Sequence, residues 1–381
     1  MDLAERIARR RATSLSDELL VDLEVLSPAH HAAEPVGRGG VLERLLDALD
    51  PLFHGSLPPN TIVYGPKGVG KSALLTALMD GLRERLGRTT ALATTTRGAR
   101  AADAWFVYVD AREATSPFKL YRTLLERVSP SAVPERGVGT AALRDRLVDR
   151  LSEPNASLVA CLDHADDPSA LTPAERADAF APIDDNLCLL TVQHELPEAW
   201  RGHTVEVGPY RRHALTDVLT ARASRGLARG AIEHDQLREI AEQADGDAHD
   251  ALAILYGAAV IASADDATRI SHGHVVDSIA TMPAEPIHIA RVLALPENRR
   301  TVLLALLDLA DDRPIAETAD AIANRMDLSA GTVKRYLYEL ADQGILERID
   351  LDRDVDGRQP TAVIPRFPPL VFQSVAQATL D

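Results

Sequence analysis

The sequence is poor in aromatic residues, in cysteine and in lysine. Each shortage limits the kinds of core, cross-link or binding surface that the protein can have. Aromatic residues make up 4% of 381 residues, so the cores must be built from Ala, Leu, Val and Ile. Cys161 and Cys188 lie in apolar, strand-like runs, which favours two buried thiols over a disulfide or a metal site.

No apolar run approaches the ~20 residues of a membrane span. The N-terminal stretch MDLAERIARRRATS lacks an apolar signal region. We therefore expect a cytoplasmic protein without a membrane partner.

Positive charge is also scarce. The formal net charge is -16, which argues against a protein that binds nucleic acid over its whole surface. Only four of the 41 basic residues are lysines. This acidic, lysine-poor composition resembles that of proteins from halophilic archaea, although a GC-rich genome would also favour arginine. In molar salt an acidic surface stays hydrated and its self-repulsion is screened within a few ångströms. The net charge can therefore reflect the solvent and not the partner.

The hydropathy pattern divides the chain into four parts. Residues 1–35 form a polar leader of mixed charge. From 36 to 207, short apolar runs alternate with helical patterns, which predicts an α/β core with a parallel sheet. The predicted strands are NTIVYG at 60–65, AWFVYVD at 104–110, SLVACLD at 157–163 and NLCLLTV at 186–192. Residues 208–281 are purely helical. Residues 282–381 begin in a proline-containing linker and combine helices with a hairpin-like stretch.

A phosphate-binding loop is the most specific motif. GPKGVGKS, residues 65–72, fits the G-x-x-x-x-G-K-[ST] pattern, follows a predicted strand and opens a predicted helix. Backbone N–H groups of such a loop, with the helix N-terminus behind them, surround phosphates, and a chance glycine-rich turn is the weaker interpretation. Lys71 is predicted to reach the β- and γ-phosphates and Ser72 to bind Mg²⁺. The expected nucleotide contacts here are Gly65, Pro66, Lys67, Gly68, Val69, Gly70, Lys71, Ser72 and Ala73.

A carboxylate follows the predicted strand at 157–163. In LVACLDHADD, Asp163 is predicted to hold Mg²⁺ through water, together with Ser72. A solvated carboxylate at a strand end is the alternative, and the preceding phosphate loop favours the metal-binding role. P-loop ATPases of the AAA+ type usually carry a glutamate at the next position to activate water. Here the next residue is His164.

The stretch 314–350 predicts a helix-turn-helix. Ser329 is the expected N-cap of the second helix, and Val333, Leu337 and Leu340 share its buried face. A strand, a turn and a returning strand follow, as in a winged helix, with acidic residues crowding the turn. Winged helices also mediate protein–protein contacts, so that alternative remains open. The expected DNA contacts are Thr332, Lys334, Arg335 and Tyr338 of the second helix and Arg353 and Arg358 of the wing.

The order of these motifs resembles that of archaeal origin-recognition and cell-division-control type replication initiators, a branch of the AAA+ ATPases. The resemblance runs from about Leu26 to Phe372. It implies an α/β AAA+ P-loop core with a parallel sheet, an α-helical lid and a C-terminal winged-helix domain. Val36, Gly37 and Arg38 match the family's adenine-side box. Tyr210, in VGPYRRHALTDVL, matches the segment that enters the lid.

Several positions depart from the family pattern. His164 replaces the catalytic glutamate, His194 aligns with the first sensor beside Gln193, and His249 replaces the second-sensor arginine. Histidine has a pKa near ~6.5 and supplies no fixed charge at neutral pH. Asp166 or Asp167 could compensate for the lost glutamate. The three histidines have no metal-ligand spacing, so a metal site is the weaker interpretation.

The resemblance also implies an arginine that acts across a subunit or senses nucleotide. Arg201, in AWRGH, is the candidate, Arg211 and Arg212 compete for the role, and a plain surface arginine is an equal alternative.

The predicted function is that of a replication-initiator-like protein with degenerate hydrolysis motifs. We expect it to bind ATP or ADP with Mg²⁺, as a structural ligand or slow switch, with weak or absent ATP hydrolysis. Its expected partners are duplex DNA of the origin type and possible further copies of itself or other replication proteins. A P-loop signalling ATPase that regulates transcription is the alternative. An active motor is disfavoured by the missing glutamate.

Overall fold

A computed structural model of the chain describes residues 18–32, 34–86, 103–129, 132–133, 137–153, 156–309, 313–351 and 359–378. Residues 31–210 form one compact unit, and residues 1–30 form a second unit together with residues 211–381. The chain therefore passes between the units twice, at His30–His31 and at Tyr210–Arg211. Among the described residues, no helix is long and apolar enough to cross a membrane.

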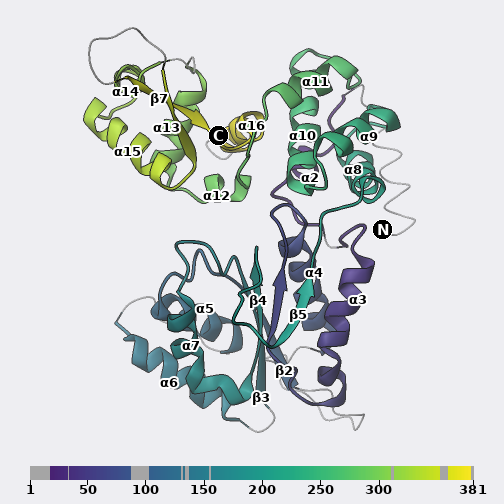
Figure 1. The fold of residues 1–381 in the computed structure, drawn as a ribbon, viewed down its shortest axis with the longest axis vertical. Helices are drawn as coiled ribbons and strands as arrows, with labels where there is room; N and C mark the ends of the chain where they lie inside the picture. The colour runs from purple at the N-terminus through teal and green to yellow at the C-terminus, as the bar shows by residue number, and fades with distance from the viewer. Residues whose placement is uncertain are drawn as a thin grey trace. The chain divides into compact units, whose positions relative to one another are not determined.

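The unit of residues 31–210 is built on a five-stranded parallel sheet with the strand order β2-β3-β4-β1-β5 (Figure 1). The four predicted strands are confirmed. A fifth, β5, was not predicted, because it is short and only Val205 of its four residues is buried. The strands are β1 Thr61–Tyr64, β2 Asp103–Asp110, β3 Ala156–Asp163, β4 Leu187–Gln193 and β5 His203–Glu206.

Helices cover both faces of this sheet because successive strand residues point to opposite sides. Trp105 and Val107 of β2 pack in one core, and Phe106, which lies between them in sequence, packs in the other. One core includes residues of α5 and α6, and the other includes residues of α3 and α4. The helical elements are α3 Gly39–Ala48, η1 Asp50–His54, α4 Lys71–Leu86, α5 Pro117–Val128, α6 Thr140–Leu151, α7 Pro173–Phe180 and η2 Ala181–Asn186.

Both cysteines are confirmed as buried free thiols. Cys161 and Cys188 lie in the core that includes α3 and α4. Burial raises the pKa of the Cys188 thiol to about 12. The thiolate is the reactive form of cysteine, so this residue acts as a small apolar side chain at neutral pH.

The second unit begins with the lid helices, and part of the predicted leader packs against them. The backbone N–H groups of Val21 and Asp22 donate to the Gly226 carbonyl at 2.9 and 3.1 Å. Arg222 is buried and donates to the carbonyls of Val25 at 2.8 Å and His30 at 2.5 Å. The helices are α2 Leu23–Leu26, α8 Arg212–Gly226, α9 His234–Gln243, α10 Ala248–Ala264 and α11 His272–Ala280.

The C-terminal part of the same unit has the element order of a winged helix. Helices α14 and α15 pack against each other, and β6 and β7 form an antiparallel hairpin. A helix, α16, follows the hairpin, with Pro369 as its first residue. This helix contacts α10 through a hydrogen bond from Tyr256 to Ser374. The elements are α12 Ile289–Leu293, α13 Glu297–Leu307, α14 Ile315–Ala323, α15 Ala330–Asp342, β6 Leu346–Asp350, β7 Thr361–Pro365 and α16 Pro369–Ala378.

The attachment of the N-terminal segment to α8 depends on Arg222. Replacing Arg222 with Ala removes two charge-assisted hydrogen bonds and leaves the Val25 and His30 carbonyls without them. We expect a loss of about 2 kcal/mol of unfolding free energy, measured by denaturant titration. Arg225→Ala, at an exposed position of the same helix, is the control and should change stability by less than about 0.5 kcal/mol. Equal stability of the two variants would contradict this role for Arg222.

Candidate functional site

The predicted phosphate loop connects β1 to α4, and its backbone requires glycine. Gly65 has φ 152°, and a Cβ built there would lie 2.0 Å from the Val207 carbonyl oxygen. Gly70 has φ 81°, with the Tyr210 hydroxyl 3.0 Å from a Cβ position. Lys71 is buried as the first residue of α4 and donates to the carbonyls of Gly65 at 2.6 Å and Pro66 at 2.7 Å. The loop therefore stands at a helix N-terminus with a lysine beside it, which suits a phosphate group.

The parallel sheet brings the other predicted residues to the same edge as this loop. Strand β4 lies between β1 and β3, so the carboxyl ends of these three strands are neighbours. The Gly65 N–H donates to the His194 carbonyl at 3.1 Å, and the Ala165 N–H donates to the Val192 carbonyl at 2.9 Å. The phosphate loop, Asp163 and His194 thus belong to one site.

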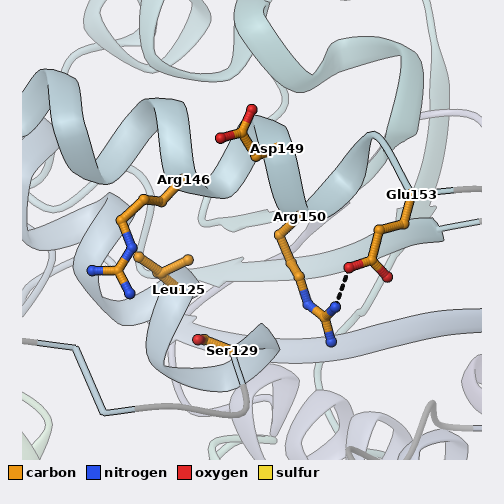
Figure 2. A pocket seen from close by; sticks show the side chains of 6 residues that line it. All are labelled: Leu125, Ser129, Arg146, Asp149, Arg150 and Glu153. Atoms are coloured by element: carbon orange, nitrogen blue, oxygen red, sulfur yellow. Dashed lines mark hydrogen bonds and ion pairs between the residues drawn. The ribbon is translucent and has the colours of Figure 1, made fainter.

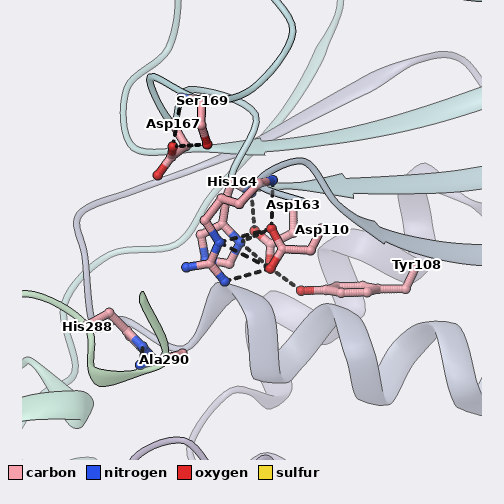
Figure 3. Close-up of polar contacts among 9 residues, drawn as sticks. Tyr108, Asp110, Asp163, His164, Asp167, Ser169, His288 and Ala290 are labelled. Carbon is pink, nitrogen blue, oxygen red and sulfur yellow. Dashed lines mark hydrogen bonds and ion pairs between the residues drawn. The ribbon is translucent and has the colours of Figure 1, made fainter. Parts of the chain in front are cut away.

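Asp163 ends β3 as a buried carboxylate with fixed orientation. It is 1% exposed. Its Oδ2 accepts a hydrogen bond from the Tyr108 hydroxyl at 2.6 Å, and its Oδ1 accepts one from the His164 N–H at 2.8 Å. Burial, with the negative Asp163 beside it, holds the pKa of Tyr108 above its usual range, so Tyr108 remains a donor. Figure 3 shows how these side chains converge.

His164 faces carboxylates. Its backbone is left-handed, with φ 55°, and its Nδ1 lies 3.5 Å from Asp110 Oδ1 and 3.7 Å from Asp163 Oδ2. Neither approach has hydrogen-bond geometry, so this buried nitrogen has no partner. Burial acts to raise the pKa of Asp110, but His164 and Arg112 outweigh it and hold that pKa below its usual range. The position of the usual glutamate is therefore held by a ring packed against two acids.

At the end of β4, the two polar side chains have separate partners. Gln193 is buried, and its Nε2 donates to the Glu195 carbonyl at 2.6 Å. His194 is about half exposed, and its Nδ1 lies 2.8 Å from Asp166 Oδ2. Of these two side chains, only that of His194 is accessible from solvent to a large extent.

The predicted adenine-side residues and Tyr210 also meet the phosphate loop. Val36 and Gly37 lead into Arg38, the N-cap of α3, which is 6% exposed. Arg38 donates to the Val69 carbonyl at 2.6 Å, and its guanidinium lies 3.5 Å from the Tyr210 ring centroid. A guanidinium over an aromatic face at this distance is an attractive cation–π contact.

The surroundings of His249 do not favour the predicted sensing role. The ring is 4% exposed within the unit that contains α10 and packs 4.2 Å from the His288 ring, centroid to centroid. Its Nε2 accepts from the Ile289 N–H at 3.0 Å, and its Nδ1 lies 3.0 Å from Asp250 Oδ1. Both ring nitrogens are therefore occupied, which leaves neither for a phosphate and also argues against a three-histidine metal site.

The candidate arginines make local contacts. Arg201 donates to the carbonyls of Glu198 at 2.5 Å and Trp200 at 2.8 Å. Arg212 forms an ion pair with Glu242 at 2.6 Å, and Arg211 is the exposed N-cap of α8. These contacts do not identify which of the three acts on nucleotide, so the role of Arg201 stays a prediction.

A surface hollow of about 250 Å³ lies elsewhere in the same unit (Figure 2). Its lining comes from the C-terminal parts of α5 and α6 and the residues just after them, near the start of β3. Parallel strands start and end at opposite edges of a sheet, so the hollow is separate from the phosphate loop. It is lined by Leu125, Ser129, Arg146, Asp149, Arg150 and Glu153.

The predicted DNA-facing helix is α15, which begins at Ala330. The Ser329 side chain accepts from the Thr332 N–H, so the predicted N-cap is confirmed, as is the buried face of Val333, Leu337 and Leu340. Lys334 and Arg335 are exposed, whereas Thr332 and Tyr338 are half-buried. Arg353 and Arg358 lie outside the described residues.

Comparisons with known proteins agree with this architecture. Residues 34–185 match the AAA ATPase domain family, and residues 216–280 match the Cdc6 AAA+ ATPase-type lid domain. The ORC1-type DNA replication protein 1 of Sulfurisphaera tokodaii is 26% identical over 74% of this chain and 72% of its own length. The ORC1-type DNA replication protein 9 of Halobacterium salinarum is 24% identical over 92% of this chain and 98% of its own.

Solved structures share the fold. The Aeropyrum pernix ORC1 protein in complex with DNA has a TM-score of 0.61 at 22% identity, covering 95% of this chain and 97% of that one. The Aeropyrum pernix ORC2 protein in its ADPNP–ADP complexes has a TM-score of 0.55 at 19% identity, covering 95% and 99%. The chain therefore combines an AAA ATPase domain with a Cdc6-type lid, and it is similar in sequence and fold to archaeal ORC1-type proteins.

Proposed function

We propose that this protein binds ATP or ADP with Mg²⁺ and binds duplex DNA as a replication-initiator-like protein. The observation that carries the proposal is the complete phosphate loop between β1 and α4, with Asp163 at the same sheet edge, in a chain that also matches the Cdc6-type lid. Relatives named as replication proteins favour this function over a signalling ATPase that regulates transcription. Such a protein would act at the chromosome, in the cytoplasm of an archaeal cell.

The site has the donors that a magnesium nucleotide needs. Lys71 and the loop N–H groups would hold the phosphates. Ser72 and Asp163 offer a hydroxyl and a carboxylate, the hard oxygen ligands that Mg²⁺ prefers, and Asp163 is already held in one orientation by Tyr108. Bound Mg²⁺ would neutralise phosphate charge. Val36, Gly37, Arg38 and Tyr210 would contact the nucleotide on its adenine side.

The DNA contact is proposed for α15. Lys334 and Arg335 are exposed on the second helix of a helix-turn-helix, the helix that enters the major groove in such motifs. Thr332 and Tyr338 flank them. The Aeropyrum pernix ORC1 protein was solved with DNA, and it shares this fold over 95% of the chain. Self-association and contacts with other replication proteins are further proposed partners.

Nuclease protection tests the DNA-binding proposal directly. The protein, in concentrated KCl with ATP and Mg²⁺, should protect a short, defined duplex when it is offered fragments of its own genome. Absence of protection of any genomic duplex at the working salt would rule out the initiator function. It would leave nucleotide binding standing.

Nucleotide binding depends on the space at Gly65. In a Gly65→Ala variant the new Cβ would clash with the Val207 carbonyl, so the loop must shift. We expect at least a tenfold weaker affinity for ATP by calorimetric titration, with an unfolding free energy lower by about 1–3 kcal/mol. Gly81→Ala on α4 is the control, since nothing lies within 4 Å of its Cβ position. An unchanged affinity in Gly65→Ala would show that this loop does not hold the phosphates.

The DNA contact of α15 can be tested by charge removal. Lys334→Ala and Arg335→Ala should each weaken DNA binding, and each lost phosphate contact should reduce the slope of log affinity against log salt by about one. Exposed Arg85 on α4 provides the control variant, Arg85→Ala. If all three variants bind DNA with the same affinity and salt slope, α15 is not the DNA-binding helix.

A further inference from the structure

His194 is joined to the phosphate loop by its own backbone. It follows β4, the strand between β1 and β3, and its carbonyl accepts the Gly65 N–H at 3.1 Å. Gly65 is the first residue of the loop. The backbone of His194 therefore lies beside the loop, and its side chain is about half exposed.

Asp166 fixes the orientation of this ring. A single carboxylate oxygen, Oδ2, accepts the His194 backbone N–H at 2.7 Å and lies 2.8 Å from His194 Nδ1. Burial acts to raise the pKa of Asp166, but the contacts from His194 outweigh it and lower that pKa. Asp166 is therefore ionised at neutral pH and can only accept hydrogen bonds.

The protonation of the ring follows from this contact. Because ionised Asp166 only accepts, the hydrogen must be on Nδ1 of His194. A neutral His194 then presents the lone pair of Nε2 as its remaining polar function. Asp166 also interacts electrostatically with Arg176 of α7. A carboxylate that holds Nδ1–H and leaves Nε2 as a base is the arrangement used by Ser-His-Asp hydrolases.

His164 is the less suitable base, although it occupies the position of the usual glutamate. Its Nδ1 is buried beside Asp110 and Asp163 without hydrogen-bond geometry to either. Asp163 is also the proposed Mg²⁺ carboxylate. The Nδ1 of His164 lies 3.5 Å from Asp110 Oδ1 and 3.7 Å from Asp163 Oδ2, whereas that of His194 lies 2.8 Å from Asp166 Oδ2. A carboxylate therefore orients His194 more closely than His164.

We propose that His194 accepts the proton of the attacking water when ATP is hydrolysed, and that Asp166 is its positioning residue. This inference rests on the proposed binding of ATP. The water oxygen bonds to the γ-phosphorus while the bond from that phosphorus to the β–γ bridging oxygen breaks. The electron pair of the broken bond leaves with ADP, and the water proton moves to Nε2 of His194. Asp166 stabilises the resulting imidazolium, which then returns its proton to phosphate or solvent.

Single-turnover hydrolysis tests the proposal. The full chain, in excess over γ-³²P-labelled ATP with Mg²⁺, is quenched over time to measure released phosphate, and ATP binding is measured separately by calorimetry. His194→Ala should cleave ATP about 10²-fold more slowly while binding ATP as before. His203→Ala is the matched control, because this exposed histidine begins β5 at the opposite edge of the same sheet.

One further readout distinguishes a proton acceptor from a structural residue. Added imidazole should restore at least a tenth of the wild-type rate to His194→Ala and none to Lys71→Ala. Asp166→Asn should cleave ATP more slowly while binding ATP as before, because the carboxylate no longer stabilises the imidazolium.

The outcomes separate this inference from the proposed function. Hydrolysis by His194→Ala at the wild-type rate, or a loss that imidazole does not restore, overturns the role of His194 and leaves nucleotide binding intact. If the wild-type protein binds ATP but never cleaves it, the role of His194 is likewise overturned and nucleotide binding again stays intact. Failure of the wild-type protein to bind ATP overturns both.

Discussion

The hydrogen bond from the Gly65 N–H to the His194 carbonyl links the two elements on which the site depends. It joins the phosphate loop to the end of β4, and β4 in turn pairs with β3, which ends in Asp163. All three strands are parallel, so their carboxyl ends lie at one edge, where ligands bind in sheets of this kind. Gly65, Asp163 and His194 are distant in sequence but lie at one site. The pairing of their strands brings them together, and no contact between their side chains is needed.

A second set of contacts connects this loop to the places where the chain leaves the core unit. Arg38 lies seven residues after the crossing at His31, and Tyr210 is the last residue before the crossing at Arg211. Arg38 is buried between the Val69 carbonyl and the Tyr210 ring. Arg38 thus joins the phosphate loop to Tyr210, and both side chains lie near the points where the chain leaves the core unit.

The sequence was sufficient to predict what depends on local pattern. The glycines and Lys71 of the predicted phosphate loop have fixed spacing, and the buried strands are continuous apolar runs. The place of the loop between a strand and a helix was therefore predicted correctly, as were four of the five strands. Strand β5 was missed because only Val205 gives an apolar signal at an edge position. The docking of the N-terminal segment was also missed, since Arg222 reaches the Val25 carbonyl across 197 positions of sequence.

Motif alignment could not predict which groups surround each side chain, because those groups come from other elements of the fold. The alignment placed His249 correctly in the lid helix, but the bond from Ile289 that occupies its Nε2 comes from a separate element. In the same way, His164 and His194 look equivalent in sequence as histidines at catalytic positions. Only the structure distinguishes a ring without a hydrogen-bond partner at Nδ1 from a ring oriented by Asp166.

The acidic surface limits how such a protein can recognise DNA. With a formal net charge of -16, its overall field repels phosphates at low salt. In concentrated salt that repulsion is screened within a few ångströms, but the counterion-release contribution to DNA affinity is lost as well. Short-range contacts must then supply most of the affinity. The four lysines of the chain include Lys334, which is exposed on α15 beside Arg335. A basic pair on one helix of an otherwise acidic chain fits recognition by direct contact, because its effect survives screening only at hydrogen-bonding distance.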